Sequence, residues 1–587
     1  MSDPPRGPGP EAVSWSRPRP DPPQDGHAPG RDRALRWGLF GLWCAVVLVG
    51  TARHEYWRDE VRAYAFARDS HTLAELFGRL KDEGHPALWH LLLYAGDALT
   101  GSKLVLPAAS LGVAAVAVAL LIFRAPLPLW LKALFVLGAL PLYEYSVVAR
   151  NYGISMLLLF VFAAWYPGRA RPALALVLGL TLAALANTNV HSLLLACLLM
   201  GLWLWDHRAA ARTPMRPCSV LGVSMAATTL AIGVLLALAT FWPSDQILPS
   251  DHTRYTAGHV VGALVAVLCD PAGGFRDLAP RVPGVVVTAI LANIVFAWAL
   301  LGLVGRPALA LLALVAVLAL GTLFAIVYPG GYRHQGLLLT FLLALYWLRF
   351  QPTPATPATP ALPARWHGLR IFGGLTVLLG IALGLGLYRL GRDLLYPQSA
   401  SRAFGELLRR HPDYRGAILL GEPDFLLESV PYYADNPIYI AREQRFGDTI
   451  RFTRASQARL GLGELLRTAA RLRDPPGARP VSTLDPEGQV RRVLVALGHL
   501  PGFDPARGVD PALGVMGSGT RGTDDAAGLR ELAYSYGRTF TWSAAELAAW
   551  RASTVLVGRF DDHIVGDERY VVYEVIAAPP PPEPGQR

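Results

Sequence analysis

The sequence predicts a polytopic, all-α membrane domain of about 11 to 13 transmembrane helices, followed by a C-terminal extramembrane α/β domain. Of the 587 residues, 52% are hydrophobic and only 17% are charged, whereas about a quarter of the residues of a soluble protein are charged. The charge is also unevenly spread, because it is sparse over residues 34–390 and returns to a soluble density beyond them. This pattern divides the chain between membrane and water.

Apolar runs follow one another through residues 34–390, and several approach the ~20 residues that a helix needs to cross a bilayer. The clearest runs are residues 113–123, 173–186, 225–241, 285–304 and 308–327. The four cysteines lie in or beside apolar runs, which argues against a disulfide framework or a thiolate metal site. We therefore expect a bundle of membrane helices and a multi-pass protein of the cell (inner or plasma) membrane.

Positive charge beside the first apolar run indicates the orientation of the chain. Residues 1–33 are rich in Pro, Gly and charge and are expected to form a disordered tail. Arg31, Arg33 and Arg36 flank the first span, and such clusters stay in the cytoplasm. Much of the net charge of +10 comes from residues in the loops between apolar runs and in the N-terminal tail, which is the pattern of a membrane protein. A nucleic-acid partner is therefore not expected.

The later loops give the orientation of the C-terminal part. The Pro-rich linker 351–364 lies between arginines and is expected to be cytoplasmic. One more span then places residues 391–577 outside the cell membrane, as an external α/β domain. Residues 578–587 are expected to form a second disordered tail.

The polar segment 54–85 follows the first span and is expected to be an external loop. Its apolar positions fit amphipathic helices that lie at the membrane interface. Between His85, expected outside, and the loop of Arg124 and Lys132, expected inside, the number of crossings has to be odd. Residues 86–101 and 105–123 nevertheless look like two apolar segments. Either the first of these is a half-span, or a later assignment is wrong.

Residues 391–577 alternate short apolar runs with helical stretches, which is typical of a small α/β domain. The apolar runs are residues 417–420, 437–440, 493–497, 554–557 and 570–575, and the helical stretches are residues 458–472 and 544–550. Because no glycine-rich fingerprint follows any of these strands, a nucleotide-binding domain is not expected.

The pair Asp59-Glu60 stands just past the first span, in the external loop. A carboxylate at the membrane face that is partly desolvated is suited to act as a general base toward a hydroxyl or an amine. The alternative is a solvated amphipathic segment whose charges interact with lipid head groups. Composition alone does not choose between these two interpretations.

Three motifs stand in order near the N-terminus: EYWRDEVRAYAFARD at residues 55–69, GHPALWHLLLY at residues 84–94 and YEYSVVARNYGISMLLL at residues 143–159. Together they resemble the opening of the C-type (GT-C) membrane glycosyltransferases. The protein O-mannosyltransferases and the lipid A aminoarabinose transferases are nearest in pattern. The residues that carry the resemblance are Asp59-Glu60, His85-Pro86 and Arg150-Asn151-Tyr152.

The sequence also departs from these families. Ala87 stands where a His-Pro-Pro motif has its second proline. Trp89-His90 stands where the protein O-mannosyltransferases have Gly-Lys, which argues against that subfamily. Two later elements, Asn189-Val190-His191 and Tyr332-Arg333-His334, resemble the starts of later spans in the same enzymes.

The resemblance implies a glycosyltransferase that takes a hexose or pentose from a polyprenyl-phosphate-linked donor. The sugar would pass to an envelope acceptor (protein, lipid or polysaccharide) on the non-cytoplasmic face. Asp59 would be the general base of an inverting displacement, and Glu60 would orient the acceptor or hold a divalent cation. The residues implied in substrate binding are Arg58, His85, Arg150, Tyr152, His191, Arg333 and His334. No cofactor and no dedicated metal site are expected.

Two other functions are open at the level of the sequence. A membrane transporter or lipid flippase tends to have symmetric halves and ionisable residues at mid-span, whereas here no repeat is visible and most spans carry no charge at their centres. A non-catalytic envelope-glycan assembly protein would keep the fold without the activity. The bias toward Ala, Arg, Pro and Gly is compatible with a bacterium of high GC content.

Overall fold

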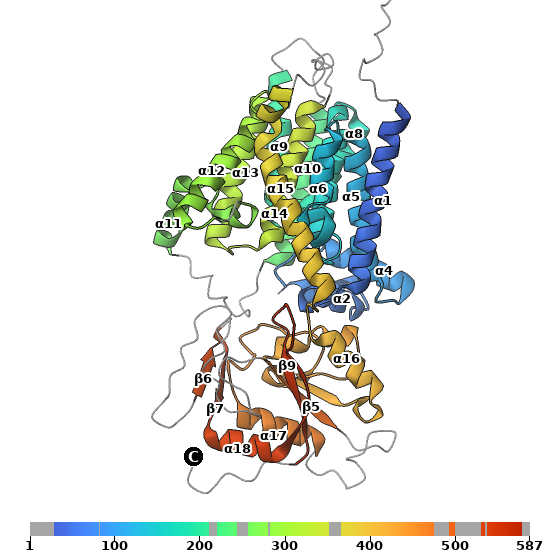
Figure 1. The fold of residues 1–587 in the computed structure, drawn as a ribbon, viewed down its shortest axis with the longest axis vertical. Helices are drawn as coiled ribbons and strands as arrows, with labels where there is room; N and C mark the ends of the chain where they lie inside the picture. The colour runs from blue at the N-terminus through green and yellow to red at the C-terminus, as the bar shows by residue number, and fades with distance from the viewer. Residues whose placement is uncertain are drawn as a thin grey trace, which may run out of the picture.

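The computed structural model describes residues 29–81, 83–210, 220–242, 256–279, 282–351, 365–474, 492–498, 530–533 and 537–577. Over these residues, a bundle of helices stands next to a smaller domain of strands and short helices, and helix α15 leads from one to the other (Figure 1). The predicted fold class, a helical membrane domain followed by an α/β domain, is confirmed.

The predicted boundaries need two changes. Helix α1 already begins at Pro29, inside the segment 1–33 that was expected to be a tail. Helix α15 continues to Leu395, past the predicted domain boundary at residue 390. Residues 1–28, the linker residues 352–364 and the C-terminal tail 578–587 lie outside the described residues.

Among the described residues, six helices are long and apolar enough to cross a membrane, judged by length and composition. They are α1 (Pro29–Arg53), α5 (Val105–Arg124), α9 (Val190–Ala210), α10 (Val220–Phe241), α13 (Pro307–Ile326) and α15 (Arg365–Leu395). The bundle also contains α6 (Leu129–Val136), α7 (Tyr152–Trp165), α8 (Pro172–Ala186), α11 (Ala257–Cys269), α12 (Val285–Leu301) and α14 (Tyr332–Phe350). A multi-pass membrane protein is confirmed, while the number of about 11 to 13 crossings stays a prediction.

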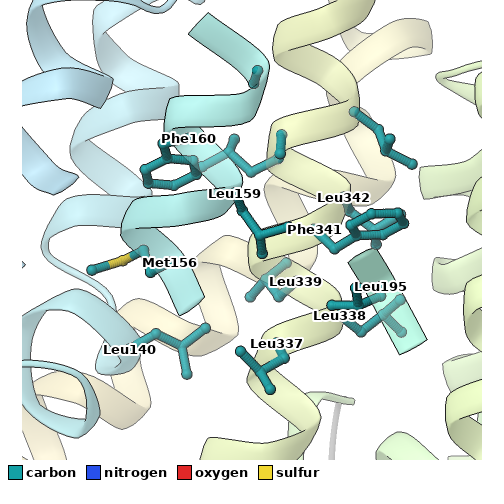
Figure 2. Close-up of a cluster of buried hydrophobic side chains, with 14 of the residues drawn as sticks. Leu140, Met156, Leu159, Phe160, Leu195, Leu337, Leu338, Leu339, Phe341 and Leu342 are labelled. Atoms are coloured by element: carbon teal, nitrogen blue, oxygen red, sulfur yellow. The ribbon is translucent and has the colours of Figure 1, made fainter. Parts of the chain in front are cut away.

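Helix α14 runs through the middle of the bundle and is buried on nearly all sides. Leu337 and Phe341 belong to the same apolar core as Leu159 and Phe160 of α7 and Leu195 of α9 (Figure 2). A helix that is apolar around its whole circumference is stable only when other helices or lipid cover it. This packing fixes the starts of α7, α9 and α14 relative to one another.

Small residues allow α8 and α10 to approach closely. A Cβ atom added at Gly233 would lie 2.7 Å from the Cα of Ala183, and one added at Gly179 would lie 2.7 Å from the Cα of Ala226. The side-chain amide of Asn187 donates a hydrogen bond to the carbonyl of Gly233 at 2.8 Å. Close contact through small residues, with a polar hydrogen bond across it, is typical of helix pairs in membranes.

Helices α2 (Arg58–Arg68), α3 (Leu73–Leu80) and α4 (Leu88–Thr100) follow α1, and α2 and α4 lie at the end of the bundle that faces the smaller domain (Figure 1). With 13 residues, α4 is about 20 Å long, which is too short for a full crossing. It packs on α2 and α5, and the hydroxyl of Tyr64 donates to Asp97 at 2.7 Å. The short helix agrees with the half-span interpretation, and the choice between the two interpretations stays a prediction.

The far end of the bundle contains a second polar cluster. Asp206 of α9 accepts hydrogen bonds from Tyr166 at 3.0 Å, from Arg169 at 3.2 Å and from Arg306 at 2.8 Å. These contacts join the end of α7, the end of α9 and the start of α13. Arg306 is therefore an ion-paired arginine that lies far from α2.

The smaller domain is built on a four-stranded sheet in the order β1-β5-β9-β8, with β1 and β5 parallel and the other neighbours antiparallel. A three-stranded sheet, β4-β7-β6, and a hairpin, β2-β3, lie beside it. The strands are β1 (Ile418–Glu422), β2 (Tyr439–Ile440), β3 (Arg445–Phe446), β4 (Arg459–Gly461), β5 (Val493–Gly498), β6 (Arg530–Ala533), β7 (Thr539–Trp542), β8 (Thr554–Phe560) and β9 (Tyr570–Val575). The helices are α16 (Ser401–Arg410), α17 (Leu462–Arg473) and α18 (Ala544–Ser553).

The predicted apolar runs of this domain correspond to β1, β2, β5, β8 and β9. The predicted helix over residues 458–472 was wrong at its start, because Arg459–Gly461 form strand β4 and the helix begins at Leu462. These three residues pair in parallel with β7, a strand that the sequence did not predict. The partner strand therefore overrides the local helical pattern.

Replacing Gly233 with Val is expected to destabilise the bundle, because the new side chain has to enter space that the backbone of Ala183 occupies. Overpacking of this kind typically costs about 1–3 kcal/mol. The apparent melting temperature of the purified protein in detergent should fall. Gly201→Val is the matched control, because a Cβ atom at Gly201 of α9 meets nothing within 4 Å. Equal losses in the two variants would contradict the close packing of α8 on α10.

Candidate active site

The residues that the sequence singled out lie at the end of the bundle that faces the smaller domain. Arg58, Asp59 and Glu60 form the first turn of α2, His85 follows α3, Arg150 and Tyr152 stand at the start of α7, His191 at the start of α9, and Arg333 and His334 at the start of α14. The start of α2 contacts the starts of α7 and α14, and the start of α14 contacts that of α9. The tertiary structure therefore gathers residues from four separate helices.

Asp59 is a partly exposed carboxylate with guanidinium groups around it. Its side chain is 38% exposed, and its oxygens lie 3.7 Å from Arg58 Nε and 3.9 Å from Arg150 Nη1. Arg150 also donates a hydrogen bond to the backbone carbonyl of Asp59. Partial burial by itself raises the pKa of Asp59, but the charges of Arg150, Arg58 and the nearby Arg333 together hold it below its ordinary value. Asp59 is therefore ionised at neutral pH.

Arg333 is held in place by contacts that the sequence did not predict. Its Nε lies 3.4 Å from a carboxylate oxygen of Glu144, which is buried and also pairs with Arg389. The guanidinium group of Arg333 lies 5.4 Å from the ring centroid of Trp57, a cation–π contact. In the sequence, only Glu144 itself indicated such a contact, because a carboxylate inside an apolar run requires a positive partner. Which arginine would supply it was not readable from the sequence.

Next to Arg333, three aromatic rings lie at the starts of α7, α9 and α14. Tyr152 and His334 lie edge to face with ring centroids 5.2 Å apart, and His334 lies 5.4 Å from His191. Nδ1 of His334 accepts a hydrogen bond from the backbone N–H of Gly331 at 3.0 Å, so this nitrogen carries no proton. These three predicted residues thus form one aromatic wall next to Arg333.

His85 lies close enough to Arg150 and Asp59 to be affected by their charges. Its Nδ1 is 3.1 Å from the carbonyl of Glu83, to which an N–H at this position donates. Burial lowers the pKa of His85, and the charge of Arg150 lowers it further. The imidazole is therefore neutral at pH 7, and its free nitrogen, Nε2, is suited to accept a hydrogen bond rather than to pair with a phosphate charge.

Glu60 points the other way, into the protein. It is fully buried, and its oxygens accept hydrogen bonds from the backbone N–H groups of Ala149 at 2.6 Å and Trp57 at 3.4 Å. The ring of His54 lies between Glu60 and Asp393, with nitrogen–oxygen distances of 3.0 and 2.8 Å. Burial by itself lowers the pKa of His54, but the two carboxylates raise it to about 10. The predicted roles of Glu60 toward an acceptor or a cation stay predictions.

The smaller domain also contacts α2. Arg58, one of the predicted substrate-binding residues, donates a hydrogen bond to Asp567 at 2.7 Å and stacks on Phe425 with its Cζ 4.7 Å from the ring centroid. One turn later, Arg62 donates to Glu428 at 2.5 Å.

In the described parts of the chain, no three His, Cys, Asp or Glu side chains are arranged to hold a metal ion.

No protein-family model and no curated protein matches this sequence. Among solved structures, the chain is similar to ArnT from Cupriavidus metallidurans bound to undecaprenyl phosphate. The identity is 13% and the TM-score is 0.45, with 94% of this chain and 100% of that chain covered. ArnT is a lipid A aminoarabinose transferase of the GT-C class. A similarity of this size transfers no residue role.

The contacts of His54 predict a particular dependence of stability on pH. Because folding raises the pKa of His54 to about 10, its ion pairs stabilise the protein fully below the unfolded pKa of about 6.5. This stabilisation is lost as the pH rises through the folded pKa. The difference in melting temperature between the protein and its His54→Gln variant should be largest near pH ~6 and shrink toward pH ~10.

The matched control for this measurement is His71→Gln, because His71 is exposed. Its melting temperature is expected to follow that of the unmodified protein across the same pH range. A difference between His54→Gln and the unmodified protein that stays constant with pH would contradict an imidazolium at His54.

Proposed function

We propose that this chain is a membrane glycosyltransferase that transfers a sugar from a polyprenyl-phosphate-linked donor to an acceptor of the cell envelope. One arrangement carries the proposal: the ionised, partly exposed Asp59 lies among the guanidinium groups of Arg150 and Arg333, at the end of an apolar bundle. A transfer of this kind needs a base for the acceptor and cations for the leaving phosphate. The resemblance of the three sequence motifs to GT-C enzymes supports the same reaction.

In the proposed reaction, a hydroxyl or amine of the acceptor attacks the anomeric carbon from the side opposite the phosphate. The bond between that carbon and the phosphate oxygen breaks, and its electron pair leaves with the polyprenyl phosphate. Asp59 accepts the proton of the acceptor, and the anomeric configuration is inverted. Arg150 and Arg333 bind the charge that develops on the leaving phosphate by charge-assisted hydrogen bonds.

The same arginines explain how a carboxylate with a low pKa serves as the base. In the free protein their charges keep Asp59 ionised. When the donor phosphate binds to them, its negative charge offsets theirs, and the pKa of Asp59 rises toward its ordinary range. A carboxylate with a higher pKa is a stronger base. Binding of the donor therefore prepares Asp59 for the transfer.

The other predicted residues have supporting places in this proposal. Tyr152, His191 and His334 are proposed to line the path between the phosphate and the bilayer, since their rings extend from Arg333 along the helix starts. Neutral His85 is proposed to accept a hydrogen bond from a sugar hydroxyl at Nε2, because its Nδ1–H already donates to the carbonyl of Glu83. Glu60 is proposed to act by fixing α2, because its hydrogen bonds attach the helix to the bundle.

Replacing Asp59 with Asn is expected to lower the rate of polyprenyl phosphate release by about 10²- to 10⁴-fold, the usual contribution of a general base. The purified protein would be supplied with lipid-linked sugars extracted from the producing cells, and the released lipid would be measured by mass spectrometry. Asp69→Asn is the control, because Asp69 caps the other end of α2 and pairs with Arg68.

Three outcomes separate the functions. Full activity in a folded Asp59→Asn variant would refute Asp59 as the base. Movement of an intact lipid-linked sugar across a vesicle membrane, without release of lipid phosphate, would favour a flippase. A protein that neither releases nor moves the lipid, and whose Asp59→Asn variant leaves the cell's glycans unchanged, would favour a non-catalytic assembly protein.

Replacing Arg150 or Arg333 with Gln is expected to weaken the binding of undecaprenyl phosphate by about 10- to 100-fold, because each removes charged hydrogen bonds to the phosphate. Binding would be measured with the protein in nanodiscs. Arg306→Gln is the control, because Arg306 pairs with Asp206 at the far end of the bundle. An equal loss of affinity in all three variants would show that the lipid phosphate binds elsewhere.

A further inference from the structure

The first turn of α2 carries Asp59, and the side chain of Glu60 in this turn accepts the N–H of Trp57. Trp57, the residue before the helix, makes no side-chain hydrogen bond to the first turn. The first N–H groups of every helix need partners outside the helix. Glu568 of the smaller domain supplies one, because its Oε1 accepts a hydrogen bond from the N–H of Arg58 at 2.6 Å, across 510 positions of sequence.

Glu568 is itself fixed by the smaller domain. It is fully buried, and its Oε2 accepts hydrogen bonds from the hydroxyls of Ser399 at 2.5 Å and Ser429 at 2.8 Å. Its backbone carbonyl accepts a hydrogen bond from Ala400 at 3.0 Å. Two segments of the domain, residues 399–400 and the segment of Ser429, therefore determine where this carboxylate stands. The smaller domain therefore also sets the position of Oε1 of Glu568, the oxygen that faces Arg58.

Further contacts on the same side of α2 agree with this role. The side chain of Arg58 pairs with Asp567, the neighbour of Glu568, and Arg62 pairs with Glu428. On the bundle side, Glu60 accepts the N–H of Ala149. The helix thus has fixed contacts to both parts of the protein, and Asp59 lies on the turn between them.

We propose that Glu568 is a positioning residue, which holds the first turn of α2 from the smaller domain and so sets the carboxylate of Asp59 against Arg150 and Arg333. This inference rests on the proposed function where it concerns the reaction. The capping contact itself is independent of that function. The smaller domain, in this proposal, contributes to the transfer through α2 without touching the donor.

Two substitutions separate the hydrogen bond from the charge. Glu568→Gln keeps an oxygen for the N–H of Arg58, and its amide can donate to the serine hydroxyls, which rotate to accept. Burial raises the pKa of Glu568 to about 7, while Arg58 and the serines limit the rise, so a neutral side chain is a close substitute. Glu568→Ala removes the contact altogether. Glu574→Gln is the matched control, because Glu574 pairs with Arg492 in the same sheet.

The experiment uses the full-length protein and three measurements. Hydrogen exchange reports the protection of the amides in the first turn of α2. Undecaprenyl phosphate serves as the binding probe, and release of polyprenyl phosphate from the cell-derived donor gives kcat. For Glu568→Ala we expect faster exchange in this turn, nearly unchanged affinity for the probe and a kcat lower by about 10²-fold, the effect of a small misplacement of a catalytic group. Glu568→Gln and Glu574→Gln should behave like the unmodified protein.

The outcomes that overturn the proposal differ from those that overturn the function. Unchanged exchange and kcat in Glu568→Ala would refute the positioning role while leaving the transferase intact. If the unmodified protein neither binds the probe nor releases the lipid, the proposed function fails, and the exchange measurement still tests the cap. Should Glu568→Ala not fold, Glu568→Asp replaces it. Its shorter side chain should accelerate exchange in the same turn, and unchanged exchange would refute the cap.

Discussion

The position of the site depends on the buried group formed by His54, Glu60 and Asp393. Charges removed from water are costly, and removing one partner of a buried pair typically costs about 3–5 kcal/mol. Here each ring nitrogen of His54 meets a carboxylate, and Glu60 also accepts two backbone N–H groups. Successive residues of a helix point about 100° apart. Because Glu60 is fixed inward, its neighbour Asp59 is directed toward the open side of α2.

The cations around Asp59 are held by contacts of their own. Glu144 pairs with Arg333 and Arg389, and Trp57 lies against the guanidinium of Arg333. An arginine that is already ordered loses less conformational freedom when it binds a phosphate. Such an arrangement stabilises developing charge without moving during the reaction. The same charges lower the pKa of Asp59, so the base and the phosphate site are coupled through electrostatics.

The two parts of the chain meet at α2, and this gives the smaller domain a physical connection to the chemistry. Its contacts with Arg58 and Arg62 are charged hydrogen bonds, which are stronger and more directional than contacts between neutral groups. The α/β domain carries no nucleotide fingerprint, and its strand β9 begins two residues after Glu568, on the side of the domain that faces the bundle (Figure 1). Its closest involvement with the proposed reaction is through the helix that bears Asp59.

The sequence by itself determined the division into membrane and extramembrane parts, because hydropathy and charge are local properties that need no tertiary contact. It also singled out Asp59, Arg150 and Arg333 as candidates, because motif order and the ends of apolar runs are readable along a single chain. Only the tertiary structure decided which groups meet: Glu144 and Arg389 are 245 positions apart, and Glu568 reaches α2 across 510. A lone sequence gives spacing within one helix or strand. It cannot assign partners between distant elements, since many arrangements of the same helices would bury them equally well.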